Sequence, residues 1–513
     1  MNLINKNTKY DNQCYFCTWL SQDLGRSHED QLSNTRQVRD LLDSKTTFGT
    51  NGTASAYPEI RKNLFFLLDD GWDVGYGLHM GRNRDMFGSL IVNTERFPEC
   101  TGTPAERLKK LNESVIKKGW RGLGIWICSN ALGETVSERF SPEKLENYYR
   151  ERMLWCREAG VFYWKVDWGH YERSADYRYM LNKIAEEVFP ELIIEHAGCC
   201  QALNGTTLNE SVENDSGRFS EWDNEHLHWA KIMSFSKVFR TYDVINQMSV
   251  PTTLDRVYEM LRLGWQNDGA NCTLNCEDEL YLGAAFGLNL GIMRSKLWNP
   301  VSAERRDPTG YRLRTTEAQR AMNWLLHFAP VMGVKEAPVY ASEEILFDSH
   351  KCEPQIFSNK YKGKNIRQGA PAVISRGCTL PEIKYREALK PFIALSRNKS
   401  GAYALASFYR KTGQNEYRTP LADTVLAIDD ISAPTAVFGY HGSVTLKYPV
   451  SVSHMKVYIQ DLAGDTALDI TDRVKFSDNR ITVDGSIIAK AGTSANPAGD
   501  RSEPGAVIRL IRP

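Results

Sequence analysis

The sequence predicts a (β/α)8 barrel followed by an antiparallel β-sandwich. Over about the first 345 residues, buried apolar segments alternate with amphipathic helices, which is typical of a parallel sheet covered by helices. Nearly every one of these apolar segments ends in polar or charged residues. The chain then changes to short alternating strands separated by turns. We therefore expect the barrel in residues 1–345 and the sandwich in residues 346–513.

About eight apolar segments are predicted to be the strands of the barrel. They lie at residues 14–19, 63–72, 123–128, 161–168, 191–198, 236–243, 271–283 and 289–297. A doubly wound open sheet is the alternative, but no glycine-rich phosphate loop follows the first strand. The closed barrel is therefore the preferred architecture.

Helices are predicted between these strands. In residues 104–119 the apolar positions recur at helical spacing, and Gly119 is a suitable stop. A second helix is expected to begin with Ser141 as the N-cap and Pro142 in the first turn, and to end at Gly160. Further helical patterns lie at residues 176–189, 252–265 and 317–333.

The C-terminal part of the chain has the pattern of an antiparallel β-sandwich. Its short alternating segments lie at residues 401–410, 424–431, 434–442, 443–450, 454–464, 472–478 and 505–513. Turn residues separate them, which is typical of sandwich domains. The stretch from Lys351 to Pro381 is rich in proline, glycine and polar residues, and we expect it to link or pad the two domains.

The composition bears on the class of partner. Lys and Arg number 63 together, as do Asp and Glu, and no block of like charge stands out, so neither nucleic acid nor a membrane surface is expected as a partner. The N-terminal residues contain no apolar signal segment, so we expect a cytoplasmic protein unless the N-terminus was processed. The 12 Trp and 23 Tyr suit a protein that stacks on sugars, although large cores also use them.

Charged side chains gather at the predicted C-terminal strand ends, where a barrel of this kind has its active site. Each such residue alone is as well explained by a loop salt bridge, but their convergence predicts a site. In YWKVDWGH, residues 163–170, Lys165 and Asp167 are two apart on a strand and so point to the same face. Burying both charges is unfavourable unless they are paired or used.

Several carboxylates with few histidines suit glycoside hydrolysis. A retaining glycosidase needs two carboxyl groups about 5–5.5 Å apart, one acting as nucleophile and one as acid/base. Asp167 is the candidate nucleophile, because the neighbouring Lys165 would lower its pKa and keep it ionised. Asp243, near Arg240 at the end of another strand, would supply the second carboxyl group.

Four motifs occur in the order seen in a known family: LDDGWD (68–73), VNTERFP (92–98), KKGWRGLGIW (117–126) and YWKVDW (163–168). With the barrel-plus-sandwich layout, they make the chain resemble the α-galactosidase and α-N-acetylgalactosaminidase family of retaining glycoside hydrolases. The resemblance implies an exo-α-glycosidase that releases terminal α-linked galactose or N-acetylgalactosamine by double displacement. It implies a glycosyl-aspartate intermediate, no cofactor, and an oligosaccharide or glycoconjugate as substrate.

The resemblance also implies roles for individual residues. Asp167 resembles the family's nucleophile and Asp243 its acid/base, although Phe239 replaces a Trp and the gap from Arg240 to Asp243 is shorter than in the family. The expected substrate-binding residues are Trp19, Asp69, Asp70, Trp72, Trp126, Lys165, Glu195, His196, Arg240 and Asp278. In NCEDEL (275–280), Cys276 and Glu277 depart from the family pattern.

The identity of the sugar is left open by the fifth strand. Depending on its register, the contact to the C2 substituent falls to Glu195 or to the small Ala197 and Gly198. A β-L-arabinopyranosidase and an enzyme acting on α-glucans are alternatives from the same clan. A carbohydrate-binding barrel without turnover is the alternative from another class. The insertion at residues 203–228 has no counterpart in the family.

Eleven cysteines are scattered along the chain. Cys14 with Cys17, and Cys272 with Cys276, invite a structural zinc hypothesis. The first pair lies within a strand-like segment without the knuckle of a zinc ribbon, so we expect buried free thiols and no metal. Whether the chain forms a homo-oligomer is left open.

Overall fold

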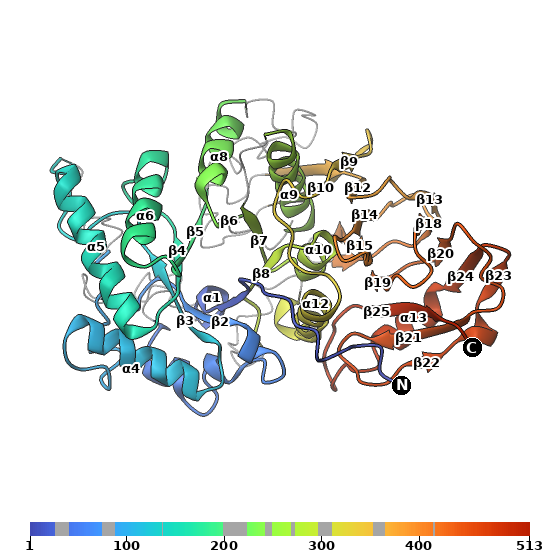
Figure 1. Cartoon of the computed structure of the whole chain (residues 1–513), viewed down its shortest axis with the longest axis horizontal. Helices are drawn as coiled ribbons and strands as arrows, with labels where there is room; N and C mark the ends of the chain where they lie inside the picture. The colour runs from blue at the N-terminus through green and yellow to red at the C-terminus, as the bar shows by residue number, and fades with distance from the viewer. Residues whose placement is uncertain are drawn as a thin grey trace.

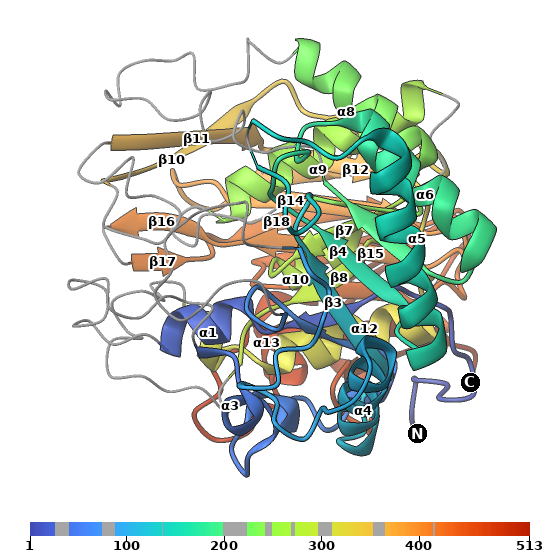
Figure 2. The same cartoon turned by 90° about the vertical axis from the view of Figure 1, so that its left-hand side faces the viewer.

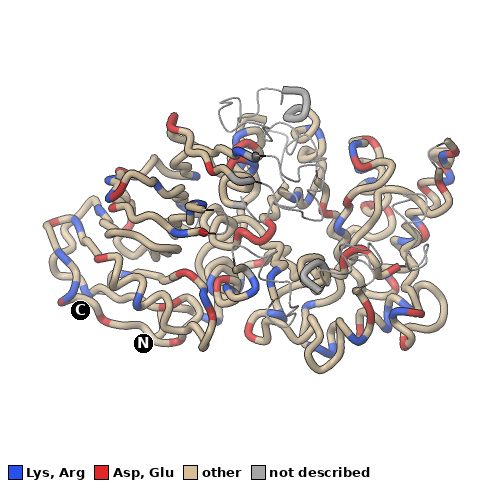
Figure 3. The backbone as a smooth tube through the Cα atoms, turned by 180° about the vertical axis from the view of Figure 1, so that it is seen from behind, with Lys and Arg blue, Asp and Glu red and all other residues tan. Residues whose placement is uncertain are grey.

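The computed structural model describes residues 1–25, 41–73, 88–135, 137–197, 223–241, 249–267, 272–295, 310–351, 365–413 and 416–513. Figure 1 shows two parts side by side, with the barrel from blue to yellow-green and a β-rich part from orange to red. Among the described residues, no helix is both long enough and apolar enough to cross a membrane. Basic and acidic residues are interspersed along the described part of the tube in Figure 3, in keeping with the balanced composition.

Eight parallel strands, β1 to β8, close into the predicted barrel, in which each strand pairs with the next and β8 pairs with β1. Their bounds are Tyr15–Cys17, Phe65–Leu68, Gly122–Ile127, Tyr163–Val166, Ile193–His196, Val238–Arg240, Thr273–Glu277 and Asn289–Ile292. Seven lie within the segments predicted from apolar patterning, and β3 begins one residue before its predicted segment. The predicted fold class of the barrel is therefore confirmed.

Helices surround this barrel. They are α1 (Trp19–Gly25), α3 (Ser44–Phe48), α4 (Pro104–Lys117), α5 (Pro142–Ala159), α6 (Ala175–Val188), α8 (Asp223–Phe235), α9 (Ser249–Gln266), α10 (Leu280–Phe286) and α12 (Thr316–His327). The helix α5 begins and ends at the predicted residues. The Ser141 side chain caps its N-terminus by accepting from the backbone N–H of Lys144, and Gly160 ends the helix at φ +69°. Gly160 is therefore a position where the left-handed conformation is required.

Alternation along each strand decides which side chains enter the barrel. Tyr15, Cys17 and Tyr163 lie in the interior cluster, whereas Phe16 and Trp164 pack outward in the large core shared with the helices. The interior face of β4 is thus the one that carries Lys165.

The C-terminal part is a sandwich of two sheets, as predicted. The larger sheet contains, in spatial order, β22 (Leu468–Asp469), β21 (Lys456–Asp461), β25 (Gly505–Ile511), β19 (Thr435–Phe438), β15 (Tyr403–Phe408), β14 (Phe392–Arg397), β12 (Val373–Arg376) and β9 (Val339–Ala341). The smaller sheet contains β13 (Glu382–Tyr385), β18 (Ala422–Ala427), β20 (Ser443–Lys447), β24 (Arg480–Asp484) and β23 (Lys475–Ser477). Most pairs are antiparallel, but β12 with β14, β15 with β19, and β18 with β20 are parallel.

Two hairpins and one helix complete this part. They are β10 (Ile345–Lys351) with β11 (Asn365–Pro371), β16 (Arg410–Gly413) with β17 (Glu416–Arg418), and α13 (Gly485–Gly492). Both hairpins extend toward the side on which α1 lies in Figure 2.

The segment 351–381, which was expected to link or pad the two domains, is more than a linker, because it contains β11 and β12. Its polar and proline-rich composition hid strands that are buried by tertiary packing.

The two parts share one continuous core. The strands β14, β15 and β19 direct alternate residues to opposite sides, for example Ile393 and Leu405 into the sandwich and Ala394, Ala404 and Ala436 toward the barrel helices. The small alanines let α10 and α12 approach the sheet closely.

Ion pairs and the N-terminal residues add to this junction. The buried Arg320 of α12 forms a bidentate ion pair with Asp461 of β21, with both N–O distances at 2.8 Å. The first residues of the chain also pack on the sandwich, where the backbone N–H of Leu3 donates to Gln460 at 2.6 Å.

Candidate active site

Six charged side chains from five barrel strands or strand ends form one buried network of ion pairs. They are Asp69, Lys165, Asp167, Glu195, Arg240 and Glu277. Asp167, with 7% of its surface exposed, is the most accessible of the six. The alternation of β4 brings Lys165 and Asp167 here, because Trp164 and Val166 pack outward.

Asp167 is held through both of its carboxylate oxygens. Oδ1 accepts from Nη2 of Arg240 at 3.0 Å, and Oδ2 accepts from the indole Nε1 of Trp126 at 2.9 Å. Burial alone raises the pKa of Asp167, but the charges of Arg240 and Lys165 and the two hydrogen bonds outweigh it and hold the pKa below its usual value. Asp167 is therefore ionised at neutral pH and fixed in orientation.

The direct ionic partner of Asp167 differs from the one that the sequence suggested. Lys165 forms its ion pairs with Asp69, at 3.1 Å, and with Glu277, at 3.2 Å. Burial lowers the pKa of Lys165, but the neighbouring carboxylates, with Asp69 the largest contributor, raise it well above its usual value. Lys165 acts on Asp167 only through its field, and the contact with Asp167 is made by Arg240 of β6.

Arg240 connects three carboxylates. Its Nη2 contacts Asp167, its Nε lies 3.2 Å from Oε1 of Glu195, and its Nη1 lies 3.7 Å from Oε2 of Glu277. The side chain is completely buried. Because a guanidinium presents its donors in a fixed planar fork, this one residue sets the relative positions of all three acids.

The register of β5 directs Glu195 into the barrel. Its Oε2 accepts from the hydroxyl of Tyr163 at 2.7 Å, and its Oε1 accepts from the hydroxyl of Tyr15 at 3.3 Å. Burial raises the pKa of Glu195 to about 7, against the lowering effect of Arg240. Ala197 is buried at the end of the same strand, and Gly198 lies outside the described residues. Of the alternatives for the contact to the C2 substituent, Glu195 or Ala197 and Gly198, the structure shows that the Glu195 side chain points into the barrel.

His196 points the other way. Its ring nitrogens lie 3.3 Å from Nη1 of Arg178 and 3.1 Å from Oδ1 of Asn182, both on α6. Burial and the Arg178 charge hold its pKa well below the usual value. The expectation that His196 binds substrate is therefore wrong, because successive strand residues face opposite sides and Glu195 takes the inner one.

The double acid after β2 lies beside the network. Asp69 accepts at Oδ2 from Lys165 and from the thiol of Cys17, the latter at 3.0 Å. Asp70 is buried next to it, and its backbone carbonyl accepts from Nε2 of Gln22 at 3.0 Å. Trp72 does not join them, because its indole is fully buried in the outer core and donates to the backbone carbonyl of Trp126 at 2.9 Å.

Asp278 belongs to a second ion network. Its Oδ1 accepts from Nε of Arg294 at 3.1 Å, and Arg294 also pairs with Glu317 at 2.7 Å. Asp278 has φ +55°, a left-handed conformation at the turn after β7. Among the described contacts of Asp278, none joins it to the network around Asp167, so its role as a sugar contact stays a prediction.

Trp126 and Trp19, two aromatic residues that were expected to bind substrate, make different contacts near the site. Trp126 packs against Trp168, with ring centroids 5.6 Å apart, and donates to Asp167 as described above. Trp19 begins α1 and packs against the interior cluster of the barrel. Both are placed on the side of the barrel where the strands end.

Several expected residues lie outside the described part of the chain. Asp243, the candidate acid/base, is one of them, and so are residues 203–222 of the predicted insertion. The remainder of that insertion is covered by the beginning of α8.

Four functional neighbours were missed from the sequence: Tyr15, Cys17, Tyr163 and Glu277. They occupy inward positions of β1, β4 and β7: Tyr15 and Cys17 are two residues apart, Tyr163 is two residues before Lys165, and Glu277 directly precedes the predicted Asp278. For Tyr15, Cys17 and Tyr163, that period-two spacing was the signal that could have found them.

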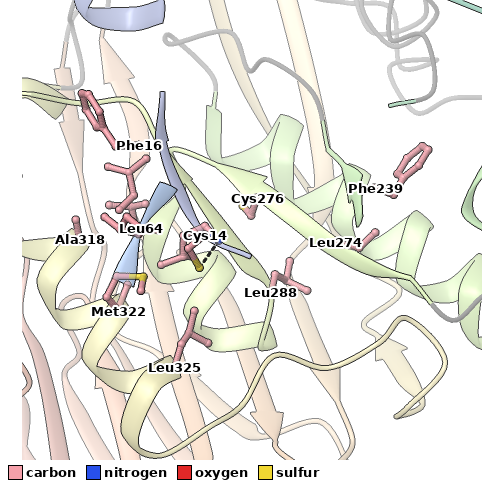
Figure 4. Close-up of a cluster of buried hydrophobic side chains, with 14 of the residues drawn as sticks. Cys14, Phe16, Leu64, Phe239, Leu274, Cys276, Leu288, Ala318, Met322 and Leu325 are labelled. Atoms are coloured by element: carbon pink, nitrogen blue, oxygen red, sulfur yellow. Dashed lines mark hydrogen bonds between the residues drawn. The ribbon is translucent and has the colours of Figure 1, made fainter. Parts of the chain in front are cut away.

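The cysteine pairs do not converge on one point. Cys17 faces the barrel interior and donates to Asp69, whereas Cys14 packs outward and its sulfur accepts from the backbone N–H of Leu290 at 3.2 Å. Figure 4 shows Cys14 and Cys276 in an apolar cluster with α12 side chains. Within the described ranges, no group of three or more potential ligands is arranged to hold a metal ion.

No protein-family model matches the chain, and no curated protein matches it in sequence. Among solved structures, the chain is similar to a β-L-arabinopyranosidase from Geobacillus stearothermophilus, at 9% identity over 98% of this chain and 97% of that one, with a TM-score of 0.43. It is also similar to an α-galactosidase from Saccharomyces cerevisiae, at 8% identity over 98% of this chain and 95% of that one, with a TM-score of 0.36.

A further match is the carboxyl transferase domain of pyruvate carboxylase from Rhizobium etli, at 13% identity over 61% of this chain and 47% of that one, with a TM-score of 0.33. With TM-scores below 0.5, none of these similarities supports a particular activity.

Proposed function

We propose that the chain is a retaining exo-α-glycosidase that releases a terminal α-linked galactose or N-acetylgalactosamine. The observation that carries the proposal is the state of Asp167: a carboxylate at the end of a barrel strand, kept ionised by Arg240 and Lys165 and oriented by Trp126. A buried, ionised and oriented carboxylate is what a glycosidase nucleophile requires.

In the proposed reaction, a carboxylate oxygen of Asp167 attacks the anomeric carbon while Asp243 protonates the leaving glycosidic oxygen. The C–O bond to the aglycone breaks and an ester bond to Asp167 forms. Asp243, now ionised, removes a proton from water, which attacks the same carbon and releases the sugar with its α configuration. Arg240 and Trp126 stabilise Asp167 as a carboxylate before attack and again as the leaving group of the second step.

Glu195 is one of the two further carboxyl groups that Arg240 contacts besides Asp167. Its pKa of about 7 would suit a general acid. It is fully buried, however, and both oxygens are engaged by Tyr163, Tyr15 and Arg240. We therefore keep Asp243 as the proposed acid/base.

Hydrolysis of activated aryl glycosides tests the proposal. The panel is α-galactoside, α-N-acetylgalactosaminide, β-L-arabinopyranoside and α-glucoside, with the first product anomer followed by NMR. Asp167→Gly should lower kcat by roughly a thousandfold or more. Asp73→Asn is the control, because Asp73 is also buried but is bonded to Ser89 and the backbone of Leu90 rather than to the ion network.

Rescue by azide distinguishes the proposed nucleophile, Asp167, from the proposed acid/base, Asp243. With an activated α-glycoside, Asp167→Gly plus azide should yield the β-glycosyl azide, because azide enters on the vacated side. Asp243→Gly plus azide should yield the α-glycosyl azide by attack on the glycosyl-enzyme. An initial β-sugar from the wild type, or no turnover of any substrate in the panel, would contradict the proposal.

A further inference from the structure

Glu277 occupies a central place in the ion network that the proposed mechanism does not use. It ends β7 and is completely buried. Its Oε1 lies 3.2 Å from Nζ of Lys165 and accepts from the hydroxyl of Tyr15 at 2.7 Å, and its Oε2 lies 3.7 Å from Nη1 of Arg240. It is thus the one described carboxylate that contacts both cations of the site.

The neighbouring strand leaves room for this side chain. Gly291 of β8 faces Glu277, and a Cβ atom on Gly291 would lie 2.8 Å from Cγ of Glu277 and 3.0 Å from the hydroxyl oxygen of Tyr15. Contacts below 3.0 Å force something to shift. A glycine at this inward position is therefore needed for Glu277 and Tyr15 to lie as they do.

We propose that Glu277 is a positioning residue for the proposed glycosidase: placed between Lys165 and Arg240, it holds the two cations close enough together for both to act on Asp167. This inference rests on the proposed function for its catalytic meaning. The titratable and charged groups that surround Glu277 come from β1, the end of β2, β4, β5 and β6, and they are Tyr15, Cys17, Asp69, Lys165, Glu195 and Arg240.

Repulsion between the like charges of Lys165 and Arg240 explains why an anion such as Glu277 is needed between them. The charge of Arg240 acts on Lys165 so as to lower its pKa, which is the signature of two cations close enough to repel each other. An anion between them offsets the repulsion. Without it, Lys165 would move toward Asp69 and Arg240 toward Glu195, because those partners remain. Asp167 would then lose part of the positive field that keeps it ionised.

The sign of a pKa shift tests this inference. Deleting a nearby anion would by simple electrostatics lower the pKa of Asp167, whereas loss of the positioned cations raises it. In Glu277→Gln we expect the acidic limb of kcat/KM to move to higher pH, by roughly one unit. We also expect kcat to fall by about ten- to a hundredfold, with KM changed less than about twofold, since Glu277 does not reach the substrate.

Two further variants complete the experiment. Gly291→Ala keeps every charge but displaces Glu277. The acidic limb of kcat/KM in this variant should therefore also move to higher pH. Glu279→Gln is the control, because this buried glutamate, two residues further along, instead accepts from Tyr409 of the sandwich at 2.7 Å and should leave the limb in place. A limb that stays or moves to lower pH in both Glu277→Gln and Gly291→Ala would overturn the inference.

A readout without substrate separates this inference from the proposed function. The carboxyl carbon of Asp167, observed by NMR in protein labelled with 13C-aspartate and assigned with Asp167→Asn, should titrate at higher pH in Glu277→Gln than in the wild type. If the wild type hydrolyses no glycoside but this shift occurs, the proposed function fails and the positioning by Glu277 stands. If hydrolysis occurs and the shift is absent, only the role of Glu277 fails.

Discussion

Replacing Glu195 by Gln should stabilise the protein at alkaline pH and leave its stability nearly unchanged in mild acid. Glu195 is fully buried between Tyr163, Tyr15 and Arg240, and burial raises its pKa from an ordinary value of 4.5 to about 7. Glutamine has the shape and hydrogen-bonding capacity of the protonated acid. It therefore mimics the state that Glu195 adopts at low pH.

The magnitude follows from the difference between the folded and unfolded pKa values. The folded state keeps its proton up to a higher pH than the unfolded chain, so ionisation of Glu195 opposes folding. This penalty is absent below the unfolded pKa, grows as pH rises toward about 7 and is complete above that value. A shift of this size corresponds to about 3 kcal/mol of unfolding free energy.

Urea unfolding of the wild type and Glu195→Gln at pH 5 and pH 8.5, with the same buffer ions, measures the effect. We expect the two proteins to differ by less than about 1 kcal/mol at pH 5, and the variant to be more stable by up to about 3 kcal/mol at pH 8.5. If the variant is destabilised equally at both pH values, Glu195 is ionised throughout and the reasoning from burial is wrong.

Two further predictions concern other contacts. Trp126→Phe removes the indole donor to Asp167 and should raise the pKa of Asp167 by about one unit, seen in the acidic limb of kcat/KM, since a hydrogen bond to a charged group contributes about 1.5–3 kcal/mol. Trp164→Phe is the matched control, because its indole donates to a neutral thiol and its loss should leave that limb unchanged, so an equal shift in both variants would contradict the assignment. Arg320→Leu should lower the unfolding free energy by about 3–5 kcal/mol by leaving Asp461 buried without its ionic partner. Much of this lost stability should be recovered in the double variant with Asp461→Leu. Strictly additive losses of unfolding free energy in denaturant unfolding would argue against this role of the ion pair.

The barrel could be predicted from the sequence because its signals are local. Each strand is an apolar run with polar residues at its end, and helix stops such as Gly160 mark the segments between them. The strands of residues 365–376 were missed because the surrounding stretch from Lys351 to Pro381 is rich in proline, glycine and polar residues, and only pairing with other strands makes them β structure.

The site could be predicted in part for the same reason. Lys165 and Asp167 share a face by strand geometry alone, and that face does enter the barrel. Which cation contacts Asp167 depends on the relative height of β4 and β6 in the closed barrel, and a single sequence does not contain that register. The same dependence left Glu195 and His196 as equal expectations.

The alanine-rich face between barrel and sandwich has a consequence for the growing chain. The helices α10 and α12 are complete by His327, but the strands that cover their apolar sides continue to Ile511. At about 5–20 residues per second, those sides stay uncovered for roughly ten seconds or longer during synthesis. A chain that stops after the barrel would keep them uncovered permanently, so the barrel is unsuited to expression as a separate fragment.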